Sequence, residues 1–499
     1  MRNLEIGLVE LYSTVDGSLY GGQSRDIYTL VRLPSRGIDL LAAILRRAGF
    51  GRVQAINPRY TNRKGRFTDA DLRRLAACDV VGLSVITRTA PQSFELARLL
   101  RRVNPEVRIL FGGPHPTAIP EEALELGDVV CLHEGDRSIV EVMERIAEDR
   151  ERPDFSGIAG IAYRDPRSGE VVRTPEREYL TSEELSALPT VEWPEEVLRG
   201  VTHLTVNTAR GCPYECEYCS VIENFGRGFR FLDDDAVIAS LRATVAQARK
   251  PIFFGDDIFT AVPSRTKRLM ERILSEDLRL PTWSAQVRVE SARDPELLAL
   301  MRRAGCNRVY IGLESINPAT LKLWNKHSTV EKNTRAVERY HEAGISVHGM
   351  FVLGSEADDL GAVRATVEYA KRLRIDTAQF FAITPLPGPP LTARYDREGR
   401  ILSKEWRLYD AQHVVVEPGR MTPYALQREI FRSARDFYSV SEAFRFLFRP
   451  HDRFYNAGVR IYGRLLTRRI ERDSASYVRQ LRALAGLEGE LDRLLGAWK

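Results

Sequence analysis

The chain has 499 residues, a length that predicts about two to four domains. With 73 basic and 68 acidic residues its net charge is only +5, which gives no reason to expect nucleic acid as a partner. No apolar stretch reaches the roughly 20 residues of a membrane span, the first residues do not resemble a signal peptide, and six cysteines are too few for a disulfide framework, so we expect a cytoplasmic protein.

Apolar runs alternate with amphipathic helical patterns over residues 1–150. Strands are predicted at residues 4–9, 53–57, 80–87, 107–113 and within DVVCLHEGD (128–136). Helices are predicted at residues 37–49, at 70–77, and from Ser93 and Ser138 onward. Strands separated by helices predict a doubly wound, Rossmann-like parallel sheet, in which ligands bind at the carboxyl ends of the strands.

Residues 151–200 differ in character, with a predicted hairpin around DPRSG (165–169) followed by a proline-bearing linker. A second strand–helix series fills residues 201–395, and residues 396–499 read as helical. Six successive βα units predict an incomplete barrel of the TIM type, with its chemistry at the carboxyl ends of the strands. The six strands are predicted at residues 203–208, 251–256, 282–288, 308–313, 346–354 and 377–385.

Three of the six cysteines, Cys212, Cys216 and Cys219, follow the first of these strands with the spacing C-x3-C-x2-C. Structural zinc prefers four protein ligands, and the nearest histidine, His203, lies back in the strand. A cubane iron–sulfur cluster held by three thiolates leaves one iron open to a small molecule. We therefore predict a [4Fe-4S] site, and expect Cys78, Cys131 and Cys306 to be small buried residues.

This spacing resembles that of the radical S-adenosylmethionine (SAM) superfamily. The resemblance implies that SAM chelates the open iron and is cleaved reductively to a 5′-deoxyadenosyl radical. It continues through FFGDDIF (253–259), YIGLES (310–315), GMFVLGSEADD (349–359) and ITPLPGPPL (383–391). It implies that Asp256 or Asp257 receives the SAM amino group, that Gln286 and Arg288 lie near its carboxylate, and that Glu314 binds the ribose. Tyr218 and Gly354 are then expected near the adenine.

The N-terminal sheet resembles the cobalamin-binding domain that precedes the radical domain in one subgroup of the superfamily. The resemblance rests on VVGLSVIT, RILFGGPHPTAIPEEAL and HEGD, and it implies a cobalamin site at Ser84, Thr87, Gly112 and Gly113. The Asp-x-His-x-x-Gly motif that supplies a lower axial histidine is missing from residues 55–65, so the cobalt is expected to lack a protein imidazole. An ordinary flavodoxin-like sheet, or a degenerate domain that binds no corrinoid, is the alternative. His115 and His133 are expected to bond to backbone groups.

The resemblance implies a cobalamin-dependent radical SAM enzyme that methylates an unactivated carbon of a small-molecule or lipid-like substrate, with flavodoxin or ferredoxin as electron donor. Three other functions stay open. The chain is alternatively an oxidative cyclase or ring-rearranging enzyme without methyl transfer, a corrinoid or electron carrier without turnover, or a zinc-binding regulatory protein.

Residues 444–472 are rich in arginine and aromatic side chains. They are predicted to form part of a helical cap in which arginines extend over apolar surface. A contact with a membrane surface or an anionic substrate is the alternative. No motif in this region or at the barrel mouth identifies the substrate.

Overall fold

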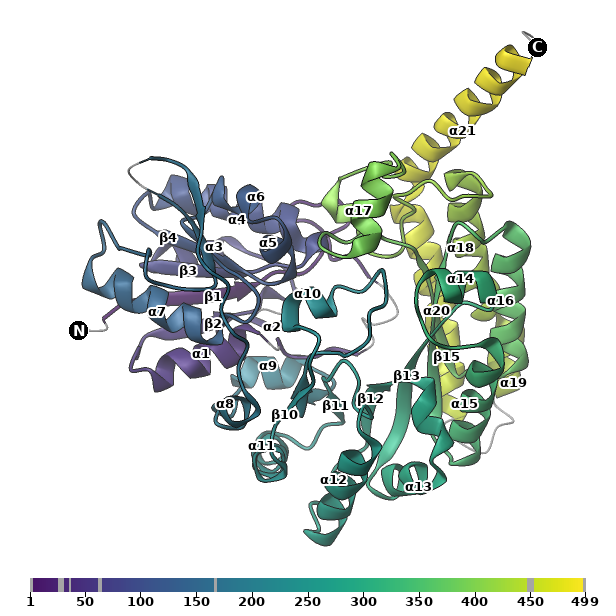
Figure 1. Cartoon of the computed structure of the whole chain (residues 1–499), viewed down its shortest axis with the longest axis horizontal. Coiled ribbons are helices and arrows are strands. Elements are labelled where there is room, and N and C mark those ends of the chain that lie inside the picture. The colour runs from purple at the N-terminus through teal and green to yellow at the C-terminus, as the bar shows by residue number, and fades with distance from the viewer. Residues whose placement is uncertain are drawn as a thin grey trace.

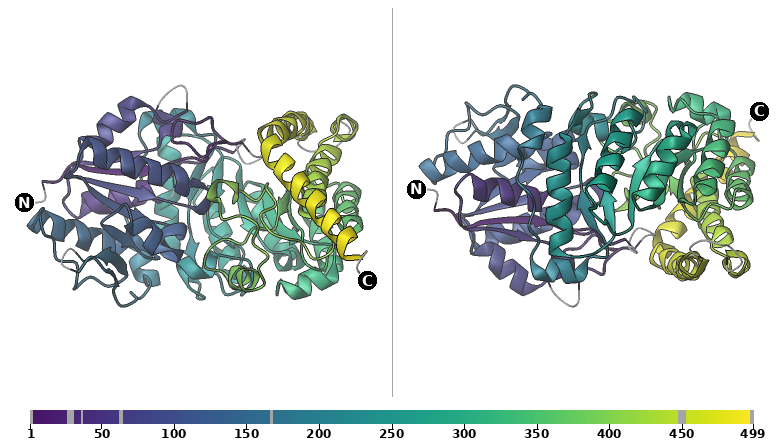
Figure 2. Two further views of the ribbon diagram at one scale, coloured as in Figure 1. Left: turned by 90° about the horizontal axis from the view of Figure 1, so that it is seen from above. Right: turned by 90° about the horizontal axis from the view of Figure 1, so that it is seen from below.

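A computed structural model describes residues 3–25, 31–35, 37–61, 65–165, 168–446 and 453–496. An N-terminal α/β unit and a second α/β unit lie side by side, and helices from the C-terminal part of the chain pack on the far side of the second unit (Figures 1 and 2). Residues 62–64, 166–167 and 447–452, which belong to three of the segments singled out in the sequence, lie outside the described residues.

The N-terminal sheet has seven strands in the order β2-β1-β3-β4-β5-β6-β7. Neighbouring strands are parallel from β2 to β5, and β6 and β7 form the predicted hairpin, which joins the sheet antiparallel to β5. The order reverses between β1 and β3, which is the topological switch point where ligands bind in such sheets. The strands are β1 (Ile6–Glu10), β2 (Val53–Ile56), β3 (Val80–Ser84), β4 (Arg108–Gly112), β5 (Val129–Cys131), β6 (Ile161–Arg164) and β7 (Val171–Arg173).

Helices cover both faces of this sheet, so its parallel strands are buried and read as continuous apolar runs. One apolar core includes side chains of α1 (Ile38–Arg47) and α7 (Gly135–Glu148), and the other includes side chains of α3 (Asp69–Ala76) and α4 (Ala90–Val103). Two short helices, α5 (Pro114–Ala118) and α6 (Pro120–Leu124), follow β4.

The second sheet has six parallel strands in the order β15-β14-β13-β12-β11-β8, which is chain order, and no pairing between β8 and β15 closes it among the described residues. It is the predicted incomplete barrel. Aspartates cap several of its helices: Asp233, Asp294 and Asp359 accept hydrogen bonds from backbone amides in the first turns of α11 (Asp234–Gln247), α13 (Pro295–Arg303) and α16 (Leu360–Arg372). The strands are β8 (Leu204–Val206), β11 (Ile252–Phe254), β12 (Trp283–Val287), β13 (Cys306–Glu314), β14 (Ser346–Leu353) and β15 (Thr377–Ala382).

The C-terminal helices α18 (Pro423–Phe437), α19 (Val440–Phe446), α20 (Arg453–Asp473) and α21 (Ala475–Gly496) cover the β15 side of this sheet, and α21 extends away from the body (Figure 1). Arg460 on α20 is fully buried, with its guanidinium 4.2 Å from the ring centroid of Phe437 and 4.0 Å from that of Phe446. This part of the arginine-rich segment is therefore a helical cap. In the described part of the chain, no helix is long and apolar enough to cross a membrane.

Candidate functional site

The three clustered cysteines lie on a hairpin whose stem is formed by two very short strands. β9 (Ala209–Arg210) pairs antiparallel with β10 (Arg230–Phe231), and the cysteines occupy the connection together with α10 (Val221–Phe225). Gly211 closes the stem with a positive φ of 92°, and a Cβ atom there would lie 2.1 Å from the carbonyl oxygen of Gly228. Only glycine fits this position, which sets the direction of the chain just before Cys212.

The thiols of Cys212, Cys216 and Cys219 are close enough to influence one another electrostatically. Burial raises the pKa of Cys212 above its ordinary value and that of Cys219 to about 12. Coordination to iron favours the thiolate and offsets this effect of burial. No three His, Cys, Asp or Glu side chains in the described ranges converge as ligands of one metal ion. In a cubane each thiolate binds a different iron, so the three cysteines fit a cluster as the donor set.

Residues 324–326, which directly follow α14 (Pro318–Leu323), contact the cysteine loop. The carbonyl of Trp324 accepts a hydrogen bond from the Glu217 amide at 3.3 Å, and the side-chain amide of Asn325 donates to the Glu215 carbonyl at 3.2 Å. The Trp324 ring contacts Tyr218 edge to face, with centroids 5.5 Å apart. Sequence reasoning missed this segment, because no spacing or composition distinguishes it.

The two adjacent aspartates after β11 lie in different environments. Asp256 is buried, and its carboxylate accepts hydrogen bonds from the Thr208 amide and hydroxyl, both at 2.6 Å, and from the Ala209 amide at 3.0 Å. It therefore fixes the start of the cysteine hairpin. Asp257 is only partly buried, and its charge raises the pKa of both Cys212 and Cys219, so it lies on the thiol side.

Glu314, the last residue of β13, has a strained backbone and a buried ion pair. Its φ is 59°, which is rare for a residue other than glycine, and the pairing of β13 with β14 is irregular just before it. Its carboxylate lies 2.6 Å from the Lys326 ammonium and also contacts Tyr218. Burial and the Glu314 charge raise the pKa of Tyr218 well above its ordinary value, so its hydroxyl stays protonated. The strand end thus aims this carboxylate at the cysteine loop.

Arg288 extends from the end of β12 to the cysteine loop. Its guanidinium lies 3.7 Å from the ring centroid of Tyr214 and donates to the carbonyl oxygen of Lys326 at 2.8 Å. Gln286 on the same strand is partly buried, and Gly354 lies buried directly after β14. All the predicted SAM residues therefore lie at or near the carboxyl ends of the barrel strands or on the cysteine loop.

The residues predicted to bind cobalamin gather at the carboxyl edge of the N-terminal sheet. Ser84 ends β3 and pairs in register with Gly112 at the end of β4, while Thr87 is buried at the start of the following turn. Gly113 has a φ of 98°, and a Cβ atom there would lie 2.7 Å from the carbonyl oxygen of Val85. Its lack of a side chain is thus needed for packing within the chain, whereas a Cβ at Gly112 would make only ordinary contacts.

The two histidines near this edge have different partners. His133 follows the prediction, because its Nδ1 lies 2.7 Å from the backbone carbonyl oxygen of Glu223. His115 does not: it lies fully buried in α5, its Nε2 is 3.2 Å from the Glu122 carboxylate, and its ring contacts Trp406. Its spacing in the sequence did not indicate this, because Trp406 lies almost 300 residues further along the chain.

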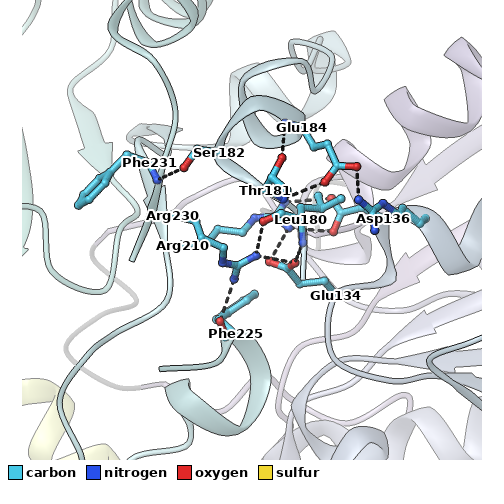
Figure 3. Close-up of polar contacts among 11 residues, drawn as sticks. Glu134, Asp136, Leu180, Thr181, Ser182, Glu184, Arg210, Phe225, Arg230 and Phe231 are labelled. Atoms are coloured by element: carbon cyan, nitrogen blue, oxygen red, sulfur yellow. Dashed lines mark hydrogen bonds and ion pairs between the residues drawn. The ribbon is translucent and has the colours of Figure 1, made fainter. Parts of the chain in front are cut away.

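A buried ionic network joins the N-terminal unit to the cysteine hairpin (Figure 3). Arg210 donates to both oxygens of Asp136, at 2.8 and 2.9 Å, and to Glu134 at 3.1 Å. Arg230 donates to the other oxygen of Glu134 at 2.8 Å. Burial opposes the charge on Arg210, but Asp136 and Glu134 raise its pKa above the ordinary value. The sequence contains HEGD and the arginine before Gly211, but no sequence pattern indicates that these residues form ion pairs.

His348 lies in the barrel interior, away from the cysteines. Its ring nitrogens lie 2.7 Å from the Thr377 hydroxyl and 3.0 Å from the Gln379 amide oxygen, both on β15. It is buried, and burial lowers its pKa to about 3. The imidazole is therefore neutral in the folded protein at physiological pH.

We expect His348 to make the barrel less stable in acid. In the unfolded chain its pKa is about 6.5, so the unfolded chain binds a proton that the folded protein does not as the pH falls from 6.5 towards 3. The free energy of unfolding is therefore unaffected above pH 6.5 and is lower by about 2 kcal/mol at pH 5. Urea unfolding at pH 7 and pH 5 measures it. His348→Gln should weaken the pH dependence and the exposed control His327→Asn should not; equal pH dependence in the wild type and His348→Gln would contradict the assignment.

Comparison with known proteins places these features in a family context. The model described as the Radical SAM superfamily matches residues 206–366, and that described as the B12 binding domain matches residues 29–143. The chain is 29% identical to an uncharacterized methyltransferase of Pyrococcus horikoshii, over 72% of this chain and 78% of the relative. It is 26% identical to the bacteriochlorophyllide d C-8(2)-methyltransferase of Chlorobaculum tepidum, over 74% of this chain and 80% of the relative.

A solved structure extends the likeness to almost the whole chain. The cobalamin-dependent S-adenosylmethionine radical enzyme OxsB, solved with aqua-cobalamin and SAM bound, superposes with a TM-score of 0.71. The match has 15% sequence identity and covers 97% of this chain and 76% of OxsB. These findings confirm the predicted fold class: a B12-binding α/β sheet, then a partial barrel, then a helical region.

Proposed function

We propose that the chain, in which the models of the Radical SAM superfamily and the B12 binding domain match successive segments, is a methyltransferase of the cobalamin-dependent radical SAM group that acts on a carbon atom of a small-molecule or lipid-like substrate. The cysteine hairpin carries this proposal, since its three thiols lie among the barrel strand ends and its stem is bound to the N-terminal unit. When bound, the cluster and SAM supply a 5′-deoxyadenosyl radical and cobalamin supplies the methyl group. Flavodoxin or ferredoxin is the proposed electron donor.

Cys212, Cys216 and Cys219 would hold the cluster, and the side chains around them would bind SAM. Of the two aspartates, we assign Asp257 to the amino group, because it is only partly buried and lies on the thiol side, whereas the buried Asp256 accepts hydrogen bonds from Thr208 and Ala209.

The other SAM residues are assigned by their places at the strand ends or, for Tyr218, on the cysteine loop. Arg288 and Gln286 would face the carboxylate, because a guanidinium is a favourable partner for that group. Glu314 would accept hydrogen bonds from the ribose hydroxyls, with its charge held in place by Lys326. Tyr218 and Gly354 would border the adenine.

At the N-terminal sheet, Ser84, Thr87 and the Gly112–Gly113 turn would bind cobalamin. Ser84 and Gly112 end β3 and β4, and Thr87 lies in the turn after β3, close to the switch point of the sheet. His115 and His133 already contact Glu122 and Glu223, respectively. We therefore propose that neither histidine coordinates the cobalt.

Methyl transfer is tested with SAM that carries a deuterated methyl group. We expect the reconstituted protein, incubated anaerobically with a reductant and an extract of small molecules and lipids, to produce a compound heavier by one labelled methyl group. A new product without label would instead support the cyclase or ring-rearranging alternative. Omission of cobalamin should abolish the labelled product.

A peripheral membrane contact is proposed for the outer face of α20, with access to a lipid-like substrate as its purpose. Phe454, Ile461 and Leu465 are 72%, 52% and 58% exposed, and exposed arginines follow on the same helix. We expect sedimentation with vesicles of anionic lipid, and replacement of the three residues by serine should reduce it at least about fivefold. Val103→Ser, an exposed apolar control in the N-terminal unit, should have no effect; equal sedimentation of all variants would remove this contact.

A further inference from the structure

The stem of the cysteine hairpin is bound from outside the barrel. Arg210 and Arg230 are directly opposed in the β9–β10 pairing, one on each side of the hairpin, and both reach Glu134 (Figure 3). Each guanidinium is bound to a different oxygen of this single carboxylate. Asp136, two residues after Glu134, accepts two further hydrogen bonds from Arg210. One short acidic segment of the N-terminal unit thus holds both strands of the stem.

The same segment also contacts the hairpin beyond the cysteines. His133, with a φ of 55°, directs its ring to the backbone carbonyl of Glu223 in α10, three residues after Ser220. The backbone amide of His133 is itself held within the N-terminal unit, because it donates a hydrogen bond to the Thr117 hydroxyl at 3.1 Å. Thr117 belongs to α5, which directly follows the Gly112–Gly113 turn. The hairpin is therefore linked at two places to the edge where the B12-type sheet ends.

We propose that Glu134 and Asp136 are positioning residues that set the cysteine hairpin, and any cluster on it, in a fixed register with the carboxyl edge of the N-terminal sheet. This inference rests on the proposed function, which needs SAM at the cluster to lie within reach of the corrinoid. Group transfer depends steeply on such placement. If only contacts within the barrel held the loop, the distance between the cluster and the corrinoid would depend on how the two units pack as a whole.

Burial makes the network suited to this role. The side chains of Glu134 and Asp136 are 5% and 8% exposed, and those of Arg210 and Arg230 are 13% and 15% exposed. Two carboxylates face two guanidiniums, so the cluster of charges is balanced. Removal of one carboxylate leaves the other facing two guanidiniums in a poorly solvated place. Without the Glu134 charge, Arg230 keeps the carbonyl oxygens of Leu180 and Phe225 but loses its carboxylate partner, which favours arrangements that move the hairpin away.

Hydrogen exchange on the protein without cofactors tests the positioning directly. Glu134→Gln keeps the shape of the side chain and removes its charge; we expect amides of residues 211–231 to exchange at least about tenfold faster, with those of β3 and β4 unchanged. Asp136→Asn should act in the same direction. Glu121→Gln removes an exposed ion pair of the same unit, with Arg173, and should change neither. Unchanged exchange at 211–231 in both network variants would overturn the proposal.

The fate of SAM in the reconstituted protein supplies the second readout. Cleavage to 5′-deoxyadenosine needs SAM only at the cluster, whereas S-adenosylhomocysteine forms when the SAM methyl group passes to reduced cobalamin. In Glu134→Gln with unchanged iron and cobalt content, we expect the ratio of S-adenosylhomocysteine to 5′-deoxyadenosine to fall at least about tenfold. An unchanged ratio contradicts the positioning role, and a wild-type protein that forms neither compound contradicts the proposed function instead.

Discussion

Replacement of Cys216 by alanine should abolish the cluster and all cleavage of SAM. With two thiolates left, two irons of a cubane lack a protein ligand, so the loss should exceed the roughly 100-fold that follows removal of an outer partner of a metal ligand. Iron content and 5′-deoxyadenosine formed with dithionite and SAM are the measurements. The wild type should produce 5′-deoxyadenosine, and its failure to do so in an iron-loaded, reduced sample would favour the carrier function.

Cys306→Ala is the matched control, because Cys306 is fully buried at the start of β13 and far along the chain from the hairpin. The Cys306→Ala protein should lose about 1 kcal/mol of stability because of the small cavity, and it should keep its iron. If Cys216→Ala kept as much iron as Cys306→Ala, the hairpin would not be the cluster site.

The strands of both sheets were predictable because burial on two faces leaves a strong signal. β1, β3 and β4 are covered by helices on both sides, so their sequences are nearly continuous apolar runs. The partial barrel followed from the same signal repeated six times with helices between. The hairpin of β6 and β7 was also predicted, from turn residues, although its pairing with β5 was not.

The candidate site was predictable only where chemistry fixes the spacing of residues along the chain. Three cysteines within eight positions stand out in any sequence, but β9 and β10 are two residues each and leave no periodic pattern. Lys326 gains its meaning only from Glu314, which a backbone irregularity directs towards it. Glu134 and Arg210 meet across 76 positions of chain, and such ion pairs have no local signal.

The two adjacent aspartates after β11 show how folding separates residues that sequence reasoning treats as equivalent, and their asparagine variants should differ sharply. Asp256 is buried, and burial raises its pKa while the Thr208 hydroxyl and amide lower it. In Asp256→Asn the amide NH2 replaces either the oxygen that accepts the Thr208 and Ala209 amides or the one that accepts the Thr208 hydroxyl, and Arg265, which also bonds to Thr208, loses its compensating charge. We expect a loss of about 2–4 kcal/mol and a melting temperature lower by about 5–10 °C.

Asp257→Asn should instead leave the fold intact and impair SAM. Its carboxylate is only partly buried on the thiol side, so the melting temperature should change by no more than about 2 °C and iron should be retained. Loss of a charge-assisted bond to the amino group should weaken SAM binding about 100-fold, a free-energy difference of about 2.7 kcal/mol. Calorimetry of unfolding and titration with SAM separate the two effects. The reverse pattern, a stable Asp256→Asn that no longer binds SAM beside a fully active Asp257→Asn, would show that the amino group goes to the buried carboxylate, and that the start of the hairpin is held by other contacts.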